Sequence, residues 1–406
     1  MLKVPRGSIN HKIKDEVKNL IKSIFFSLNS DQTVERFEQK FAFYNERKFC
    51  CAFPFARTAF YYSIKSLNIP KGSEIIMSPI TIKPILDVIL DLGLIPVFCD
   101  LDLNTLCFSE EDLDKKINKK TKLIVLTYLF GMVPNLDFYS KHKNDQIMII
   151  EDFSQCLNGK FEDKSVGTLG DISIYSSSSI KTLDTYGGGL AITDTEKLFV
   201  SLKEHQSKLT PPSRIFLIQK ILINLIRNIL TNHYIFNFFT YYLLFFVNFF
   251  SKNSKMLGSR SQKPIKSLPK WWFQKYTSLQ AIIGIKKIDQ IKKEDEKRIR
   301  IAKNIKNLSS QNQLKFPANN ESHFNVYWQL LFYSNNRDSL RNDLFKKGID
   351  TSSTSLEKIC GLKDYGFNHI LPNVEKIYKN SLFFPCFSKM NKKQEDKIYK
   401  VIKELK

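Results

Sequence analysis

The sequence predicts an α/β fold in which helices cover both faces of a mostly parallel sheet. Six short apolar runs follow one another within the first 200 residues, and helical stretches lie between several of them. Continuous apolar runs are typical of strands buried on both faces, and their alternation with helices is typical of a parallel sheet. In such sheets the chemistry belongs at the carboxyl ends of the strands. The expected strands lie within residues 74–78, 95–100, 122–130, 147–152, 172–176 and 190–194.

The helices expected around these strands follow from the spacing of apolar residues. Val34, Phe37, Phe41 and Tyr44 share one face of a helix over residues 34–44. A second helix follows ARTAF, and further helices are expected over residues 84–93 and 110–117.

Changes in composition divide the chain into five segments. The stretch before residue 250 is strongly apolar, the helices that follow are ordinary or charged, and the last hundred residues give strand, helix and strand signals. We therefore expect an N-terminal segment (1–29), a large α/β domain (30–206), an apolar insertion with basic flanks (207–270), returning helices (271–310) and a small α+β C-terminal domain (311–406).

Length and composition exclude several classes of protein. The chain has 406 residues, of which 43% are hydrophobic and 25% charged, values that exclude wholesale disorder. The seven cysteines are scattered without a CxxC pair, so neither a zinc site nor a disulfide framework is expected, and no metal site is predicted. The first residues lack the apolar core of a signal peptide, so we expect a cytoplasmic protein.

The net charge of +22 is concentrated in one region of the chain. Residues 1–200 carry 25 Lys/Arg and 25 Asp/Glu, whereas residues 251–306 carry 16 and 4. The basic region lacks a nucleic-acid-binding motif and lies beside an apolar run, so nucleic acid is not expected as a partner.

The apolar run inside the insertion admits three interpretations. Residues 234–250 carry no charge over 17 positions, which is short of the roughly 20 that a membrane-spanning helix needs. We expect a helical hairpin over 214–250 that lies in one leaflet, at the inner face of the cell membrane, with its flanking lysines toward anionic lipid. The alternatives are a single span, which would separate the two domains, and a hairpin buried against a dimer mate or another protein.

Two of the expected strands end in reactive side chains. EDFSQC ends a strand with Asp152, which suits a protonated pyridine nitrogen, and Gln155 follows where it can reach a ring hydroxyl. SSSSIK follows the next strand: the hydroxyl of Ser176 suits a phosphate, and Lys181, just beyond the strand end, has an amine that can form a Schiff base. Taken singly, each segment is more often an ordinary strand-to-loop connection.

A pyridine nitrogen, a ring hydroxyl, a phosphate and an aldehyde that forms a Schiff base occur together in the cofactor pyridoxal phosphate (PLP). Two further segments of the chain suit PLP. ARTAF begins a helix whose first amides can bind an anion, with the Thr58 hydroxyl and the Arg57 charge nearby. Alternatively, Thr58 is a helix N-cap. The glycines at 187–189 permit a tight turn close to a cofactor, although they permit any tight turn.

Taken in order, these segments resemble the DegT/StrS family of PLP-dependent sugar aminotransferases. RFEQKFAFY, PKGSEIIMSPIT and IPVFCDLDLNTL extend the resemblance before the strand ends. TSLQAIIGIKKI, FKKGIDTSST and SLFFPCFSKMNKKQEDKIYKVI extend it late in the chain. The resemblance implies a fold-type-I architecture with a mostly parallel central sheet in a large domain and a smaller α+β C-terminal domain. The apolar helical hairpin is an addition to it.

The resemblance also implies roles for individual residues. Lys181 would carry the cofactor and move protons between two carbon centres, Asp152 would pair with the pyridine nitrogen, and Gln155 would contact the ring oxygen. The phosphate would be held by Thr58, Ala59 through its backbone, and Ser176, with Arg57 adding charge. The implied reaction moves an amino group, usually from glutamate, to a keto group of a nucleotide-linked sugar in amino-sugar or surface-polysaccharide synthesis. The implied assembly is a homodimer.

Five positions depart from the family's pattern. Arg57 stands where a Gly is common, Gly187 where a Glu is usual, and Ile82 where an aromatic residue often lies. Phe273 stands at the position of a family Asn that reaches the partner subunit's phosphate, and Lys275 stands at the position of a family Arg. The alternative function is therefore a catalytically silent family member that acts as a membrane-associated scaffold in glycan assembly.

Overall fold

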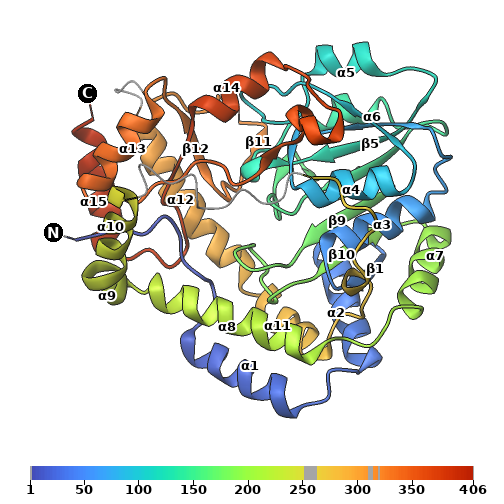
Figure 1. Cartoon of the computed structure of the whole chain (residues 1–406), viewed down its shortest axis with the longest axis horizontal. Helices are drawn as coiled ribbons and strands as arrows, with labels where there is room; N and C mark the ends of the chain where they lie inside the picture. Colours follow the sequence, from blue (N-terminus) through green and yellow to red (C-terminus); the bar gives the residue numbers. More distant parts are fainter. Residues whose placement is uncertain (1, 251–262, 310–313, 319–320, 406) are drawn as a thin grey trace.

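The computed structural model describes residues 2–250, 263–309, 314–318 and 321–405. Its centre is a seven-stranded sheet with strand order β1-β10-β9-β6-β5-β2-β4 (Figure 1). Strands β9, β6, β5, β2 and β4 are parallel to one another, and β10 runs antiparallel to both β9 and β1. The strands are β1 (Phe49–Phe53), β2 (Glu74–Met77), β4 (Ile95–Phe98), β5 (Thr121–Thr127), β6 (Met148–Asp152), β9 (Ile172–Ser176) and β10 (Gly189–Thr193).

The predicted α/β class with a mostly parallel sheet is confirmed. All six expected apolar runs form strands of this sheet, and the strand β1 joins them from a segment that was not expected to be a strand. β1 pairs antiparallel with β10 at the sheet edge, and four of its five residues are buried. Its sequence, FCCAF, is too short to show a period, so the sequence alone does not distinguish it from a helix end.

Four helices of the large unit follow the order that the sequence predicts: α2 (Asp31–Tyr44), α3 (Ala56–Ser66), α4 (Lys83–Asp91) and α5 (Glu110–Lys116). Two further helices, α6 (Leu136–Ser140) and α7 (Glu196–Ser207), were not predicted. Helix α2 begins after Ser30, whose side chain accepts a hydrogen bond from the Thr33 amide. It buries Phe37 and Phe41 completely.

The C-terminal part returns along α2 and then forms a smaller α+β unit. Helix α11 (Ser278–Ile288) packs on α2 at Gly284, where a Cβ atom would lie 2.3 Å from the Phe37 ring. The long helix α12 (Ile291–Ser309) follows and packs against α15. The small unit contains β12 (Leu330–Tyr333), α13 (Arg337–Lys346), α14 (Pro372–Asn380), β14 (Ser381–Phe384) and α15 (Lys392–Lys403). Short strands complete the fold: β3 (Ile80–Thr81), β7 (Lys160–Phe161), β8 (Lys164–Ser165), β11 (His323–Phe324) and β13 (Glu357–Lys358).

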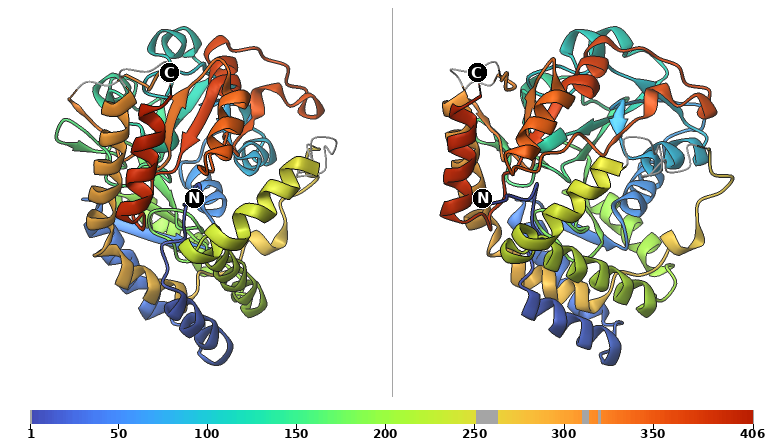
Figure 2. Two further views of the ribbon diagram at one scale, coloured as in Figure 1. Left: turned by 90° about the vertical axis from the view of Figure 1, so that its left-hand side faces the viewer. Right: turned by 60° about the vertical axis from the view of Figure 1, so that its left-hand side comes forward.

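The insertion lies along the body of the protein beside the N-terminal segment (Figures 1 and 2). Its longest helix, α8 (Arg214–Leu230), packs along α1 (Ile13–Phe25), and a chain of shorter helical turns follows past the N-terminus. These turns are α9 (His233–Ile235), η2 (Phe236–Thr240) and α10 (Tyr241–Phe250). Within the described ranges, no single helix has the length and hydropathy needed to cross a membrane. The two halves of the insertion meet those requirements only as a pair bent by 58°.

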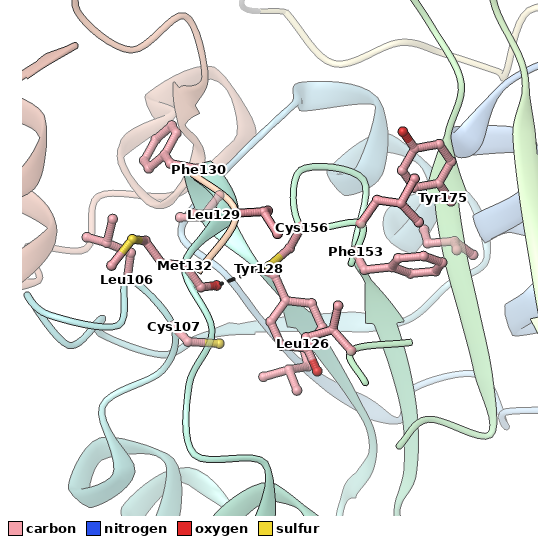
Figure 3. Packing of buried hydrophobic residues seen from close by; sticks show 14 of the residues in the cluster. Leu106, Cys107, Leu126, Tyr128, Leu129, Phe130, Met132, Phe153, Cys156 and Tyr175 are labelled. Carbon is pink, nitrogen blue, oxygen red and sulfur yellow. Dashed lines mark hydrogen bonds between the residues drawn. The ribbon is translucent and has the colours of Figure 1, made fainter. Parts of the chain in front are cut away.

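All seven cysteines are buried and unpaired. Figure 3 shows Cys107 and Cys156 among the apolar side chains of the core, near Leu126, Tyr128 and Phe153. Burial raises the pKa of both thiols, which keeps them neutral and unreactive at ordinary pH.

Candidate active site

The site is built where β6 and β9 end side by side. Asp152, the last residue of β6, pairs in register with Ile174 of β9. The Ser154 amide donates to Asp152 Oδ1 at 3.0 Å, and the Ser154 hydroxyl accepts from the Ser176 amide at 2.9 Å. Ser154 therefore ties the two strand ends together and fixes the direction of the Asp152 carboxylate.

Asp152 and its neighbour Glu151 play different roles although they are adjacent. The Glu151 carboxylate is fully buried beneath the site. It accepts four hydrogen bonds, from the Tyr128 hydroxyl, the Gly167 and Gly170 amides and the Ser173 hydroxyl. Because successive side chains of a strand point to opposite faces, Asp152 is directed away from this network.

Lys181 lies in the loop after β9 within electrostatic reach of Asp152. Burial lowers the pKa of the Lys181 amine to about 8, and the Asp152 carboxylate opposes this shift. Burial raises the pKa of Asp152, while hydrogen bonds from Ser154 and the charge of Lys181 lower it. An amine with a pKa near 8 is partly neutral at physiological pH, as a nucleophilic or proton-transferring lysine must be.

An aromatic ring covers the lysine. The Lys181 ammonium nitrogen lies 4.1 Å from the centroid of the Trp328 ring, and the Trp328 indole donates to the Ile180 carbonyl at 3.0 Å. Trp328 precedes β12, about 150 positions after the lysine, and no motif around it marks it as a site residue. Sequence reasoning therefore missed it.

Gln155 is buried beside Asp152 and holds a strained turn. Its side-chain oxygen accepts from the Phe130 amide at 2.9 Å, and Phe130 has a φ of 58°, in the left-handed region. With its oxygen engaged, the amide nitrogen of Gln155 is the end that can donate to a cofactor oxygen.

The start of α3 approaches the strand ends through Gly189. Ser176 pairs with Gly189 of β10, and a Cβ atom at Gly189 would lie 2.2 Å from the Phe55 carbonyl oxygen and 2.4 Å from the Ala56 nitrogen. Glycine is required there because the backbone at the helix start occupies that space. The expected anion site at α3 thus adjoins Ser176 at the end of β9.

The side chains at this helix start are differently engaged. The Thr58 hydroxyl donates to the Trp272 carbonyl at 2.7 Å, and the Thr58 and Ala59 amides donate to the Phe55 carbonyl. The amides of Ala56 and Arg57 precede these bonds, so helix geometry gives them no acceptor within α3.

Arg57 carries the unpaired charge of this corner. Its guanidinium carbon lies 4.1 to 5.0 Å from the rings of Phe55, Trp271 and Trp272. Burial lowers the Arg57 pKa to about 10, and its Nε atom is buried with no hydrogen-bond partner in the described part of the chain. An orphaned buried donor on a cation suits an anionic group such as a phosphate.

The remaining departures from the family's pattern occupy structural positions. Phe273 packs edge-on against Tyr61 and Tyr62, with ring centroids 5.2 and 5.9 Å away. The Lys275 amine lies 3.4 Å from the Asp31 carboxylate. Ile82 is the N-cap residue of α4.

These residues fit PLP. The structure places a lysine amine with a lowered pKa within electrostatic reach of a strand-end carboxylate, and an amide donor three residues after that carboxylate. At the start of α3 it places a buried guanidinium whose Nε has no hydrogen-bond partner among the described residues. The first three suit the aldehyde carbon, pyridine nitrogen and ring oxygen of the cofactor, and the fourth suits its phosphate.

Comparison with known proteins assigns the chain to a family. The family model described as the DegT/DnrJ/EryC1/StrS aminotransferase family matches residues 8–208 and 274–403. GDP-perosamine synthase of Escherichia coli O157:H7 is 29% identical over 197 residues, which cover 48% of this chain and 54% of that protein. The chain thus spans about half the length of the curated relatives that it matches.

Solved structures share the fold over nearly the whole chain. An aminotransferase from Psychrobacter cryohalolentis superposes with a TM-score of 0.76 and 19% identity, covering 98% of this chain and 97% of that one. The PLP-form of the sugar aminotransferase Spr1654 of Streptococcus pneumoniae gives a TM-score of 0.73 and 15% identity, covering 100% and 97%. At these identities the structures show the fold.

Proposed function

Because the chain belongs to the DegT/DnrJ/EryC1/StrS aminotransferase family, we propose that it is a PLP-dependent aminotransferase that acts on a keto group of a sugar. The observation that carries the proposal is the position of Lys181, in the loop after β9, within electrostatic reach of Asp152 at the end of the neighbouring strand β6, with its amine 4.1 Å from the Trp328 ring centroid. The predicted cofactor residues Arg57, Thr58, Ala59, Asp152, Gln155 and Ser176 remain proposals. Among them, the Thr58 hydroxyl and the Ala59 amide already donate to backbone carbonyl oxygens.

The chain's own side chains account for the proton movements that such a reaction needs. Bound PLP supplies an electron sink for the carbon that loses its proton. Lys181, with a pKa near 8, can accept that proton at its Nζ atom and return it to another carbon. When PLP is bound, the Asp152 carboxylate would stabilise positive charge on the pyridine nitrogen. The Trp328 ring, 4.1 Å from the Lys181 amine, would shield that amine from water.

We propose glutamate as the donor and a nucleotide-linked keto sugar as the acceptor. The relative named GDP-perosamine synthase supports a nucleotide-linked sugar. The test mixes the PLP-loaded protein with glutamate, or with glutamine for comparison, and measures the keto acid released. We expect release with the parent protein and with Lys119→Met, which alters an exposed lysine, and none with Lys181→Met. Keto-acid release by Lys181→Met at the parent rate would overturn the proposal.

A catalytically silent scaffold is the second candidate. The substitutions Phe273 and Gly187 favour it, because they alter two positions of the family's pattern. A scaffold has no need of a lysine whose pKa is lowered to about 8 beside a buried carboxylate, so we rank it second.

We also propose that the protein contacts a membrane through helix α1 and the insertion. Helix α1 buries polar side chains and exposes apolar ones. Glu16 and Ser23 are fully buried, whereas Ile21 and Ile24 are 51% and 45% exposed. Helix α8 likewise buries Asn224 and Asn228 and exposes apolar side chains: Ile215, Leu222, Ile223 and Ile226. Exposed lysines at the N-cap of α1 (Lys12) and within it (Lys14 and Lys18) favour an anionic bilayer as the occupant of this apolar face.

Vesicle flotation tests the membrane contact. We expect the protein to float with vesicles that contain anionic lipid, and to lose this binding when Ile21 and Ile24 are changed to Glu. Phe43→Ser, which alters an exposed phenylalanine on α2, is the matched control. If the parent stays unbound and instead forms a dimer that Ile21→Glu/Ile24→Glu dissociates, a second copy covers this face and the membrane proposal is wrong.

The unpaired buried cysteines suit a reducing compartment, so we propose that the enzyme works in the cytoplasm. We propose a homodimer as its assembly, as the family resemblance implies. Light scattering of the purified protein measures its mass directly, and a monomeric mass at micromolar concentration would contradict this assembly.

A further inference from the structure

A cavity of about 280 Å³ lies beside Lys181. The loop that carries the lysine contributes Ile180 and Thr182 to its wall, and Trp328, whose ring faces the amine, contributes as well. The N-terminal residues 6–10 and the C-terminal part of helix α8 also line it. The insertion therefore reaches the space next to the reactive amine.

The cavity carries positive charge without a lining carboxylate. Three arginines line it, and none of its lining residues is Asp or Glu. The Arg6 guanidinium makes two bonds of 2.7 Å to Asp350, and Arg298 bonds Asp295 at 2.6 Å. Arg227 of α8 makes no side-chain hydrogen bond or ion pair with the residues that the structure describes. It is thus the uncompensated cation at this cavity.

Buried amides fix the position of Arg227. The Asn224 side chain donates to Asp184, three residues after Lys181, at 3.1 Å. The Asn228 side chain donates to the His11 carbonyl at 2.6 Å and to Glu16 at 2.7 Å. Rotating α8 would leave these buried polar groups unsatisfied, so its register against the lysine loop is well defined.

We propose that Arg227 binds an anionic oxygen group of the substrate, a carboxylate or a phosphate, in the cavity beside Lys181. The inference rests on the proposed function and names a binding residue for that same site. A guanidinium can form two parallel hydrogen bonds to either group, and neutral donors on the wall can complete the binding: Ser8, Gln329 and Ser352. The family model does not match residues 209–273, so this contact comes from the chain's own insertion.

The test titrates the full-length, cofactor-free protein with inorganic diphosphate and, separately, with glutarate, an unreactive dicarboxylate. Calorimetry gives the affinity, and the fluorescence of Trp328, checked against Trp328→Phe, reports binding in this cavity. We expect Arg227→Gln to weaken the affinity for the preferred anion about tenfold or more, and Arg227→Lys to retain part of it. Arg36→Gln, an exposed arginine on α2, should bind as the parent does. Preference for diphosphate identifies a phosphate-bearing substrate, and preference for glutarate identifies the donor carboxylate.

Two results would overturn the subsite. One is an absence of binding of either anion to the parent protein at about 10 mM, and the other is equal binding by the parent, Arg227→Gln and Arg227→Lys proteins. Because the titration needs neither cofactor nor turnover, it separates the two proposals. A protein that binds the anion through Arg227 but transfers no amino group contradicts the proposed function alone. An active enzyme whose anion affinity and KM are the same in the parent and in Arg227→Gln contradicts the subsite alone.

Discussion

The two adjacent carboxylates at the end of β6 are expected to have different roles, Glu151 in stability and Asp152 in cofactor binding. We predict that Glu151→Gln lowers the free energy of unfolding by roughly 2–4 kcal/mol, because it removes a buried charge that accepts four hydrogen bonds. Asp152→Asn should change stability by less than about 1 kcal/mol and weaken PLP binding instead. Urea unfolding and PLP titration of both variants measure the two effects. Equal loss of stability in both would refute the division of roles.

The lowered pKa of Lys181 predicts how stability depends on pH. Below pH 8 the folded, cofactor-free protein carries a buried charge that costs free energy. Between pH 8 and 10.5 the folded state releases this proton while the unfolded state keeps it, so stability rises with pH in that window.

Replacing the lysine removes this dependence. Lys181→Met should be about 1–3 kcal/mol more stable than the parent near pH 7, and the difference should shrink toward pH 10. Lys119→Met, at an exposed site, corrects for other groups that titrate. A constant difference across this range would show that Lys181 has an ordinary pKa.

The close packing of α2 against α11 depends on the absence of a side chain at Gly284. A Cβ atom at Gly284 would lie 2.3 Å from the Phe37 ring, which is fully buried. We predict that Gly284→Ala destabilises the protein by about 1–3 kcal/mol through overpacking, and that adding Phe37→Leu restores part of this loss. Thermal unfolding of the single and double variants measures it. Unchanged stability in Gly284→Ala would mean that the two helices have room to move apart.

For the helices of the insertion, the sequence predicts the apolar character but not which side chains face inward. Its apolar composition predicts a surface or membrane contact, but does not show that Asn224, Asn228 and Asn237 turn inward to bond the lysine loop and the N-terminal segment. Hydrophobic periodicity assumes that apolar faces are buried, and in α1 and α8 the exposed stripe is apolar.

At the scale of the whole molecule, the N-terminal segment joins the insertion to the small unit. Val4 pairs with Gly348 and Asp350 through backbone hydrogen bonds, and the Lys3 amide donates to Asn237. Removing residues 1–6 should loosen the insertion, so we predict that trypsin cleaves after Arg227 about fivefold faster or more. Cleavage after Lys115 in α5 should stay unchanged. Equal rates after Arg227 in both proteins would show that the segment is dispensable.

The order of strands and helices could be predicted because alternating apolar runs leave few arrangements for a parallel sheet. The strand-end residues Asp152 and Lys181 could be singled out because chemistry in such sheets belongs at carboxyl ends. Trp328, Arg6 and Arg227 could not, since each reaches the site from a distant segment through tertiary packing. The division of the chain into five segments stays a prediction.

The assignment of Lys181 as the lysine that binds PLP can be tested by locating the attached cofactor. The protein is mixed with PLP, its absorption is recorded, and the link is then reduced with borohydride and mapped by peptide mass spectrometry. We predict a band at roughly 410–430 nm and a pyridoxyl group on the peptide that contains Lys181. The absence of a band, or a pyridoxyl group on another buried lysine such as Lys287, whose pKa is also lowered by burial, would contradict the account.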